Sequence, residues 1–224
     1  MSRATLFAAG TVAFAAAVWA ALDSSHDGLS LLLVAFALLA VGASWLERRP
    51  DSAKEVALIA TLAAAAAAGR VLFAAIPGVQ PVTVITVVAG AALGARSGFA
   101  VGAIAAFVSN FFLGQGLWTP WQMIGWGACG AVGALTGPFV RGRLQFAALC
   151  AVLGFGFSAL MDVWTWLSFF PHTWAALTLQ IARGFPFDMA HAVGNVLLVL
   201  AAGPELRRVL ERYERRTRVE IAWA

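Results

Sequence analysis

The stretch "VALIATLAAAAAAGRVLFAAI", Val56 to Ile76, contains one charged side chain, Arg70, in an otherwise apolar run. A helix needs about 20 apolar residues to cross the hydrocarbon core of a bilayer, which is about 30 Å thick. The stretch has this length and therefore predicts a transmembrane helix. Because a charge inside such a helix is costly and is usually retained for function, Arg70 is the first candidate site residue.

Similar apolar runs recur along the chain, with short polar breaks between them. Of the 224 residues, 61% are hydrophobic and 12% are charged, whereas a soluble domain carries about 25% charged residues. We therefore predict an all-α integral membrane protein with eight spans, namely Thr5–Leu22, Leu29–Leu46, Val56–Ile76, Pro81–Gly94, Phe99–Leu113, Pro120–Phe139, Leu144–Phe170 and Phe187–Ala202.

The basic residues predict the orientation of these spans. If the chain starts inside, every lysine and arginine except Arg70 and Arg183 falls in a cytoplasmic segment, as the positive-inside rule requires. Both termini are then cytoplasmic, and the protein is a multi-pass component of a bacterial cytoplasmic membrane. Alternatively, Thr5–Leu22 is a cleaved signal peptide, since Arg3 precedes this apolar run; cleavage would remove one crossing.

The polar loop Glu47–Glu55 divides the chain. We predict two N-terminal transmembrane helices over residues 1–50, a six-helix membrane domain over 51–203 and a basic tail over 204–224. Four apolar residues of the tail recur at helical spacing among arginines: Leu206, Val209, Leu210 and Tyr213. This pattern is typical of an amphipathic cytoplasmic helix on the membrane surface. A tail that only fixes the topology is the other interpretation.

Polar side chains inside the predicted spans gather in the outer half of the membrane. They are Arg70, Asn110, Gln122, Asp162, Asp188, His191 and Asn195, and Gln115, Trp118 and Trp121 lie close to Gln122 in the sequence. Because several helices place polar groups at one depth, the sequence predicts an outward-facing pocket with apolar walls and a few polar anchors.

Each of these residues also has a purely structural interpretation. Tryptophans anchor helices at membrane interfaces. Arg70 and Asp162 would neutralise each other if their helices were adjacent. His191 would serve as a hydrogen-bonding contact between helices. The shared depth of the polar residues, rather than any one of them, therefore carries the pocket prediction.

The chain lacks the motifs of an energy-converting enzyme. It has no GxxxxGK[ST] phosphate loop, and Lys54 is its only lysine, so it cannot hydrolyse ATP by that mechanism. Cys129 and Cys150 lie inside predicted helices without metal-binding spacing. We expect no enzymatic activity, cofactor or metal.

Ala60 and Ala64 offer a small-residue face on which a second membrane subunit can pack closely.

The segment from Val56 to Ala202 resembles the substrate-binding S component of energy-coupling factor (ECF) vitamin transporters. The resemblance rests on "RVLFAAIPGVQPVT" (70–83), "SNFFLGQG" (109–116) and "WTPWQMIGWG" (118–127). It implies a six-helix bundle that captures a vitamin from outside, docks on a transmembrane T subunit and is driven by two ATPases. The two leading helices depart from the six-helix pattern of that family.

The resemblance also implies roles for residues. Arg70, Asn110, Gln115, Trp118, Gln122 and Asp162 would cap or line the site. The Ala-x-x-x-Ala motif that contacts the T subunit matches Ala60 and Ala64, although Ala63 and Ala67 match equally well. We expect Arg70 to face an anionic or carbonyl group and the indoles to stack on a ring system. A cobalamin-type substrate is favoured, with riboflavin, thiamine and folate as alternatives.

Two other functions remain open. "GFSA" (156–159) and "AHAVGN" (190–195) resemble the serine and histidine segments of rhomboid intramembrane proteases, in which Ser158 and His191 would form a catalytic dyad. The serine segment lacks the second glycine of that family. A structural membrane scaffold without small-molecule affinity is the third possibility.

Overall fold

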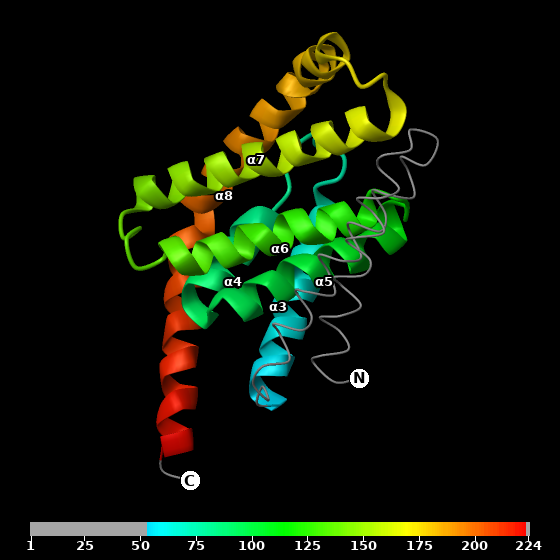
Figure 1. Ribbon diagram of the computed structural model, residues 1–224. Helices are drawn as coiled ribbons and strands as arrows, with labels where there is room; N and C mark the ends of the chain where they lie inside the picture. The colour runs from blue at the N-terminus through cyan, green and yellow to red at the C-terminus, as the bar shows by residue number, and fades with distance from the viewer. Residues whose placement is uncertain (1–52, 223–224) are drawn as a thin grey trace.

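The computed structural model describes residues 53–222, except for the side chains of Glu214 and of residues 216–222. This part of the chain is all helical and contains no strand. Its helices are α3 (Ala53–Leu72), α4 (Val82–Leu93), α5 (Ala95–Leu113), α6 (Thr119–Thr136), α7 (Arg143–Phe169) and α8 (Trp174–Ala222) (Figure 1). Each of the six spans predicted after residue 53 falls on one of these helices, so the all-α prediction is confirmed. The spans predicted over Thr5–Leu22 and Leu29–Leu46 lie outside the described residues.

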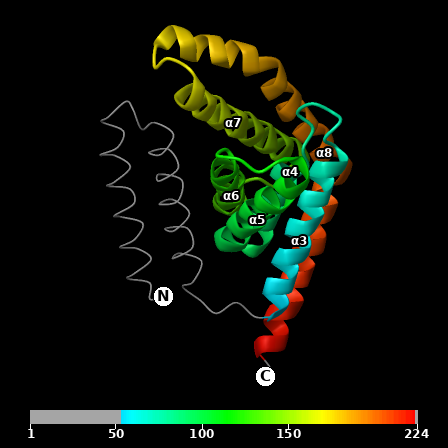
Figure 2. The ribbon, with the colours of Figure 1, turned by 90° about the vertical axis from the view of Figure 1, so that its right-hand side faces the viewer.

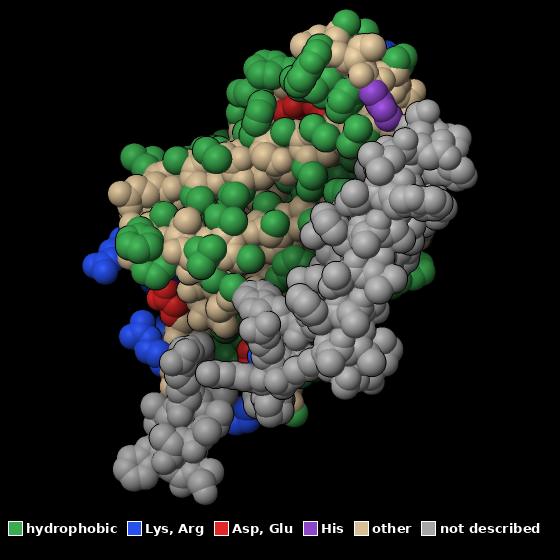
Figure 3. All heavy atoms as spheres, in the orientation of Figure 1, with side chains coloured by type: hydrophobic (Ala, Val, Ile, Leu, Met, Phe, Trp, Pro, Cys, Tyr) green, Lys and Arg blue, Asp and Glu red, His purple; other side chains and the backbone are tan. Residues whose placement is uncertain are grey.

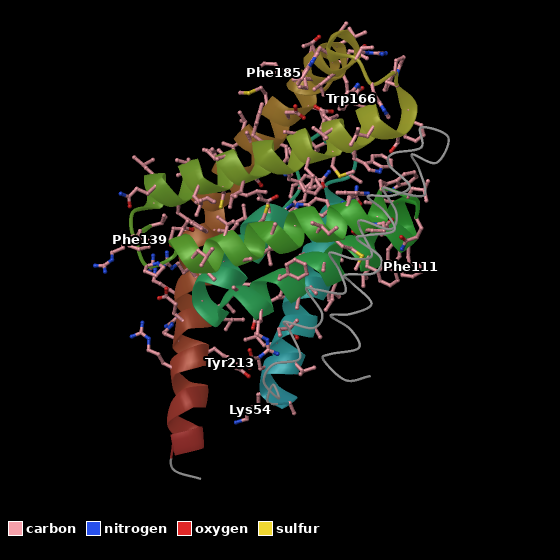
Figure 4. All side chains as sticks on the ribbon, in the orientation of Figure 1. Lys54, Phe111, Phe139, Trp166, Phe185 and Tyr213 are labelled. Atoms are coloured by element: carbon pink, nitrogen blue, oxygen red, sulfur yellow. The ribbon has the colours of Figure 1, made fainter. Side chains whose placement is uncertain are left out.

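Four of the described helices are long and apolar enough to cross a membrane. They are α3, α5, α7 and the part of α8 from Trp174 to Tyr213. The helix α4 is apolar but has only 12 residues. Large hydrophobic side chains are also exposed on the outside of the bundle, as on a protein surrounded by lipid. Phe111 and Phe139, for example, lie at opposite ends of the bundle (Figure 4) and are 67% and 80% exposed.

The helices form a crossed arrangement. Figures 1 and 2 show α4, α5, α6 and α7 stacked on one another, while α3 and the C-terminal half of α8 run across this stack. The most extensive contacts join α5 to α6 and α7 to α8, whereas α6 and α7 contact each other much less. The apolar core takes residues from all six described helices, among them Val87, Val101 and Trp126 of α4, α5 and α6.

Glycines allow α4, α5 and α6 to approach one another closely. A Cβ atom on Gly98 of α5 would lie 2.5 Å from the Cα of Gly90 in α4 and 2.8 Å from the carbonyl oxygen of Gly130 in α6. Both neighbours are backbone atoms, which cannot move aside as a side chain can. The three helices therefore meet at a point that only glycine fits.

The last helix differs from the prediction. The sequence indicated a span beginning at Phe187 and a separate tail from residue 204, but α8 is one helix of 49 residues that contains Pro186 and Pro204. A proline removes one backbone hydrogen bond, and neighbouring helices compensate for this loss in membrane proteins. The tail also belongs to the bundle, since Leu210 is buried in the core. Arg207 donates to the carbonyl oxygens of Val140 (2.6 Å) and Gly137 (2.9 Å) after α6.

Candidate binding site

Arg70 lies in the last turn of α3 and is buried. Its guanidinium group donates hydrogen bonds to four neutral side chains from α5, α6 and the loop before α4. The acceptors are Ser109 Oγ (2.7 Å), Asn110 Oδ1 (2.6 Å), Gln80 Oε1 (3.3 Å) and Gln122 Oε1 (3.4 Å). The charge is thus stabilised by side-chain dipoles rather than by a counter-ion. The network ties the end of α3 to two other helices.

The network continues around the turn between α5 and α6. The Nδ2 of Asn110 donates to Gln122 Oε1 at 2.8 Å and to Thr119 Oγ1 at 2.9 Å. Thr119 donates in turn to Gln115 Oε1 at 2.9 Å. On the other side, the guanidinium carbon of Arg70 lies 4.7 Å from the centre of the Trp126 ring, a cation–π contact. The loop therefore holds the Arg70 network in place.

His191 belongs to a second network between α8, α4 and the loop before α4. Its Nδ1 lies 2.6 Å from the carbonyl oxygen of Gly78, and its Nε2 lies 3.1 Å from Thr83 Oγ1. A carbonyl can only accept, so Nδ1 carries the proton and Nε2 of the neutral ring accepts from Thr83. Thr83 also accepts from Trp126 Nε1 at 3.1 Å. His191 is thus a contact between helices.

The serine–histidine dyad of the protease alternative is not formed. Both ring nitrogens of His191 are engaged by Gly78 and Thr83, and the hydroxyl of Ser158 has no hydrogen-bond partner. Ser158 and His191 therefore do not form the hydrogen-bonded pair that the protease mechanism requires.

A cavity of about 370 Å³ lies where the contact between α6 and α7 is sparse. Four of the predicted site residues line it, and they come from four helices: Arg70, Gln122, Asp162 and Asp188. The remaining lining residues are Gln80, Phe157, Ser158, Met161, Thr165, Gly184 and Phe187. Figure 3 shows acidic side chains in a recess between α7 and the upper part of α8, surrounded by hydrophobic groups. The cavity thus has apolar walls with a few charged and amide groups.

The cavity has a basic end and an acidic end. We call Arg70 with its acceptors Gln80 and Gln122 the basic end, and Asp162 with Asp188, whose carboxyl groups lie next to each other, the acidic end. Among the described residues, Arg70 forms no ion pair with either aspartate; its hydrogen bonds all go to neutral groups. The alternative interpretation, in which Arg70 and Asp162 neutralise each other, is therefore not what the described residues show. The amide acceptors around Arg70 make a counter-ion unnecessary.

Residues 50–209 match the model of a family of unknown function, DUF6580. The chain belongs to the DUF6580 family. No curated protein and no solved structure matches it. The matched residues begin just before α3 and end within α8, so the family includes every residue that lines the cavity.

The other predicted site residues of this DUF6580 protein lie outside the cavity lining. Trp118 packs edge-on against Trp164, with 6.2 Å between ring centres. Trp121 is half-buried, and its buried Nε1 has no partner. Asn195 is fully buried, and its Nδ2 donates to the carbonyl oxygen of Cys150 in α7 at 3.3 Å. Asn110 and Gln115 support the Arg70 network from outside the cavity.

Gln80, Ser109 and Thr165 are polar residues of the site that were not predicted from the sequence. Gln80 and Ser109 accept hydrogen bonds from Arg70, and Thr165 lines the cavity. Gln80 and Ser109 fall inside the "RVLFAAIPGVQPVT" and "SNFFLGQG" motifs, and this position could have indicated that they belong to the site. Ser158 was predicted only as the nucleophile of the protease alternative, not as a residue of the binding cavity.

A second, apolar groove of about 460 Å³ lies between α3 and α5. Ala60 and Ala64 line it, and both are exposed. Ala63 and Ala67, the alternative register, are buried in the bundle. Of the two alanine registers, only the one predicted for subunit docking therefore faces outward in the described part of the chain.

Proposed function

We propose that this DUF6580 protein is the substrate-binding membrane subunit of an ATP-driven importer of the ECF type. The observation that carries the proposal is a cavity of about 370 Å³ within a bundle of apolar helices, lined by Arg70, Gln122, Asp162 and Asp188. Buried polar side chains in membrane helices are expensive and tend to mark substrate pathways. A scaffold has no need of such a cavity.

In this proposal the chain crosses a bacterial cytoplasmic membrane eight times, with both termini in the cytoplasm. The distribution of lysine and arginine along the sequence supports this orientation. The cavity then opens toward the outside, where the substrate is captured. Cytoplasmic arginines, such as Arg208 and Arg212, lie near anionic lipid headgroups.

The energy comes from partner subunits. The chain lacks a phosphate-binding loop, so a T subunit and two ATPases drive the transport cycle. The exposed face with Ala60 and Ala64 along the α3–α5 groove is where the T subunit docks, since small side chains allow close helix packing in membranes.

The substrate is a vitamin or a related micronutrient. The sequence motifs favoured a cobalamin-type ligand, but a cavity of about 370 Å³ is at the lower end of the range for small-molecule sites. A corrinoid is much larger than this. The cavity therefore favours a compact micronutrient with one or two rings.

The test is mass spectrometry of the small molecules released from the purified full-length protein. Thr165→Phe fills the cavity, because Thr165 lines it and its hydroxyl bonds only to the carbonyl oxygen of Met161 in the same helix. Thr61→Phe is the matched control, since Thr61 is exposed and makes the same bond to Ala57. We expect a micronutrient from the wild type and from Thr61→Phe, and a loss of at least about 10-fold in Thr165→Phe. Equal amounts from both variants, or none from the folded wild type, would contradict the proposal.

A further inference from the structure

The basic end and the acidic end of the cavity differ in how much hydrogen-bonding capacity is left for a ligand. At the basic end, the hydrogen bonds from Arg70 to Gln80, Ser109, Asn110 and Gln122 use all but one N–H of the guanidinium group. A ligand anion would therefore find a guanidinium group that is already largely bonded.

At the acidic end, buried oxygen atoms lack partners. Asp162 is 8% exposed; its Oδ1 accepts from Gln180 Nε2 at 3.0 Å, whereas its Oδ2 has no hydrogen-bond partner. Ser158, which is 4% exposed, lies beside Asp188, and its hydroxyl can donate as well as accept a hydrogen bond. All three residues line the cavity. This wall therefore presents a carboxyl oxygen of Asp162 that lacks a hydrogen-bond donor, beside a second carboxyl group and a hydroxyl.

Asp188 adds a second carboxyl group to the same wall. It is 3% exposed and lies next to Asp162. Among the side chains that the structure describes, no lysine, arginine or histidine forms an ion pair with either aspartate. Two adjacent carboxyl groups in a desolvated place repel each other when both are ionised, and either a shared proton or a positive charge between them removes this repulsion.

We propose that the wall formed by Asp162, Asp188 and Ser158 binds a positively charged nitrogen of the ligand, so that the substrate is a compact organic cation. This inference rests on the proposed function. The apolar side chains Phe157, Met161 and Phe187 hold the hydrocarbon or aromatic body of the ligand. The amides of Gln80 and Gln122 at the other end bond to its neutral polar edge.

The residues present favour an organic cation over a metal ion. Among the described residues, no group of three or more histidine, cysteine, aspartate or glutamate side chains can hold a metal. A bare cation the size of Mg²⁺ or Ca²⁺ takes at least six oxygen ligands, more than the two carboxyl groups and one hydroxyl of this wall supply. An ammonium or ring nitrogen needs only the two carboxylates and a hydroxyl acceptor.

The test compares three probes of different charge on the purified full-length protein. They are thiamine, which has a fixed positive charge, riboflavin, which is uncharged, and folate, which is anionic. Binding is measured by quenching of tryptophan fluorescence, and the charge of any retained molecule is determined by mass spectrometry. Asp162→Asn keeps the acceptor oxygen for Gln180 and removes only the charge. Glu205→Gln is the control, since Glu205 is exposed on the tail.

We expect the cationic probe or a retained cation to bind the wild type and Glu205→Gln equally. Binding of the cation to Asp162→Asn and to Asp188→Asn should be weaker by about 10-fold or more, because each variant leaves the desolvated charge of the ligand with one carboxylate fewer. A retained molecule or preferred probe that is neutral or anionic, or unchanged affinity in both variants, would overturn the cation assignment and leave the importer proposal standing. If nothing is retained and no probe binds, both fail.

Discussion

At the scale of single residues, the site depends on a buried cation held by neutral groups. The N–H groups of Arg70 point to acceptors on α5, on α6 and on the loop before α4. A planar guanidinium group can reach several acceptors at once, which a lysine ammonium group cannot do in the same geometry. Arg70 therefore sets the relative positions of these elements as well as the charge of the cavity.

Replacing Arg70 by lysine should destabilise the protein although the charge is retained. The variant leaves buried acceptors such as Ser109 and Asn110 without donors, at a cost of about 2 kcal/mol. We expect the midpoint of thermal unfolding in detergent to fall by about 5 °C. Arg212→Lys on the exposed tail should leave it unchanged. Equal midpoints for Arg70→Lys and the wild type would show that the network contributes little to stability.

The sequence indicated which residues would take part in this network, but not which of them would bond to each other. Arg70, Asn110 and Gln122 were recognisable because polar side chains stand out in apolar runs. Their bonds to one another were not predictable, because they depend on how α3 crosses α5 and α6. The same limit explains why His191 and Asn195 were assigned to the pocket: they share a helix face with Asp188, but the structure directs them to α4 and α7.

At the scale of helices, the close packing of α4, α5 and α6 fixes the frame around the cavity. The hydrophobic runs located these helices, since a length of apolar residues is a local property. Their crossing point was not predicted, because it depends on Gly90, Gly98 and Gly130 meeting in space. The continuation of α8 through Pro186 was also missed, because the local rule that proline ends a helix is overridden by packing in the bundle.

Adding one methyl group at this crossing should be costly. A Cβ on Gly98 meets backbone atoms of Gly90 and Gly130 at 2.5 and 2.8 Å, so Gly98→Ala must separate the helices. Such overpacking costs about 1–3 kcal/mol. In Gly156→Ala, by contrast, the new methyl group meets no atom within 4 Å, and alanine favours the helix by up to about 1 kcal/mol. In thermal unfolding followed by tryptophan fluorescence, the midpoint temperature of Gly98→Ala should be lower than that of the wild type. The midpoint of Gly156→Ala should equal or exceed it. The reverse order would contradict the packing.

The exposed face of α3 can be tested separately from the cavity. Ala64→Leu places a large side chain in the α3–α5 groove, whereas Ala65→Leu alters an exposed alanine that does not line it. If the groove receives the T subunit, Ala64→Leu should retain the bound micronutrient but lose cellular uptake, and Ala65→Leu should retain both. Normal uptake by Ala64→Leu would move the docking face elsewhere.

At the scale of the whole molecule, the cavity results from the bundle rather than from any one motif. Its walls come from α3, α6, α7, α8 and the loop before α4, and it lies where α6 and α7 separate. Composition predicted a helical membrane protein; the helical part is confirmed, and four helices among residues 53–222 are long and apolar enough to cross a membrane. The position, size and charge of the cavity follow from tertiary packing, which local patterns do not encode.

The central claim is that the cavity opens to the outside of the membrane and holds a small ligand. Its most direct test is labelling of Gln122→Cys and Asp188→Cys in intact cells with a membrane-impermeant maleimide, using Arg212→Cys on the tail as the cytoplasmic control. The native Cys129 and Cys150 are buried, and the unsubstituted protein measures their background. We predict that the two cavity cysteines react from outside and that the tail cysteine reacts only after permeabilisation. Reaction of Gln122→Cys and Asp188→Cys from opposite sides of the membrane would contradict the account.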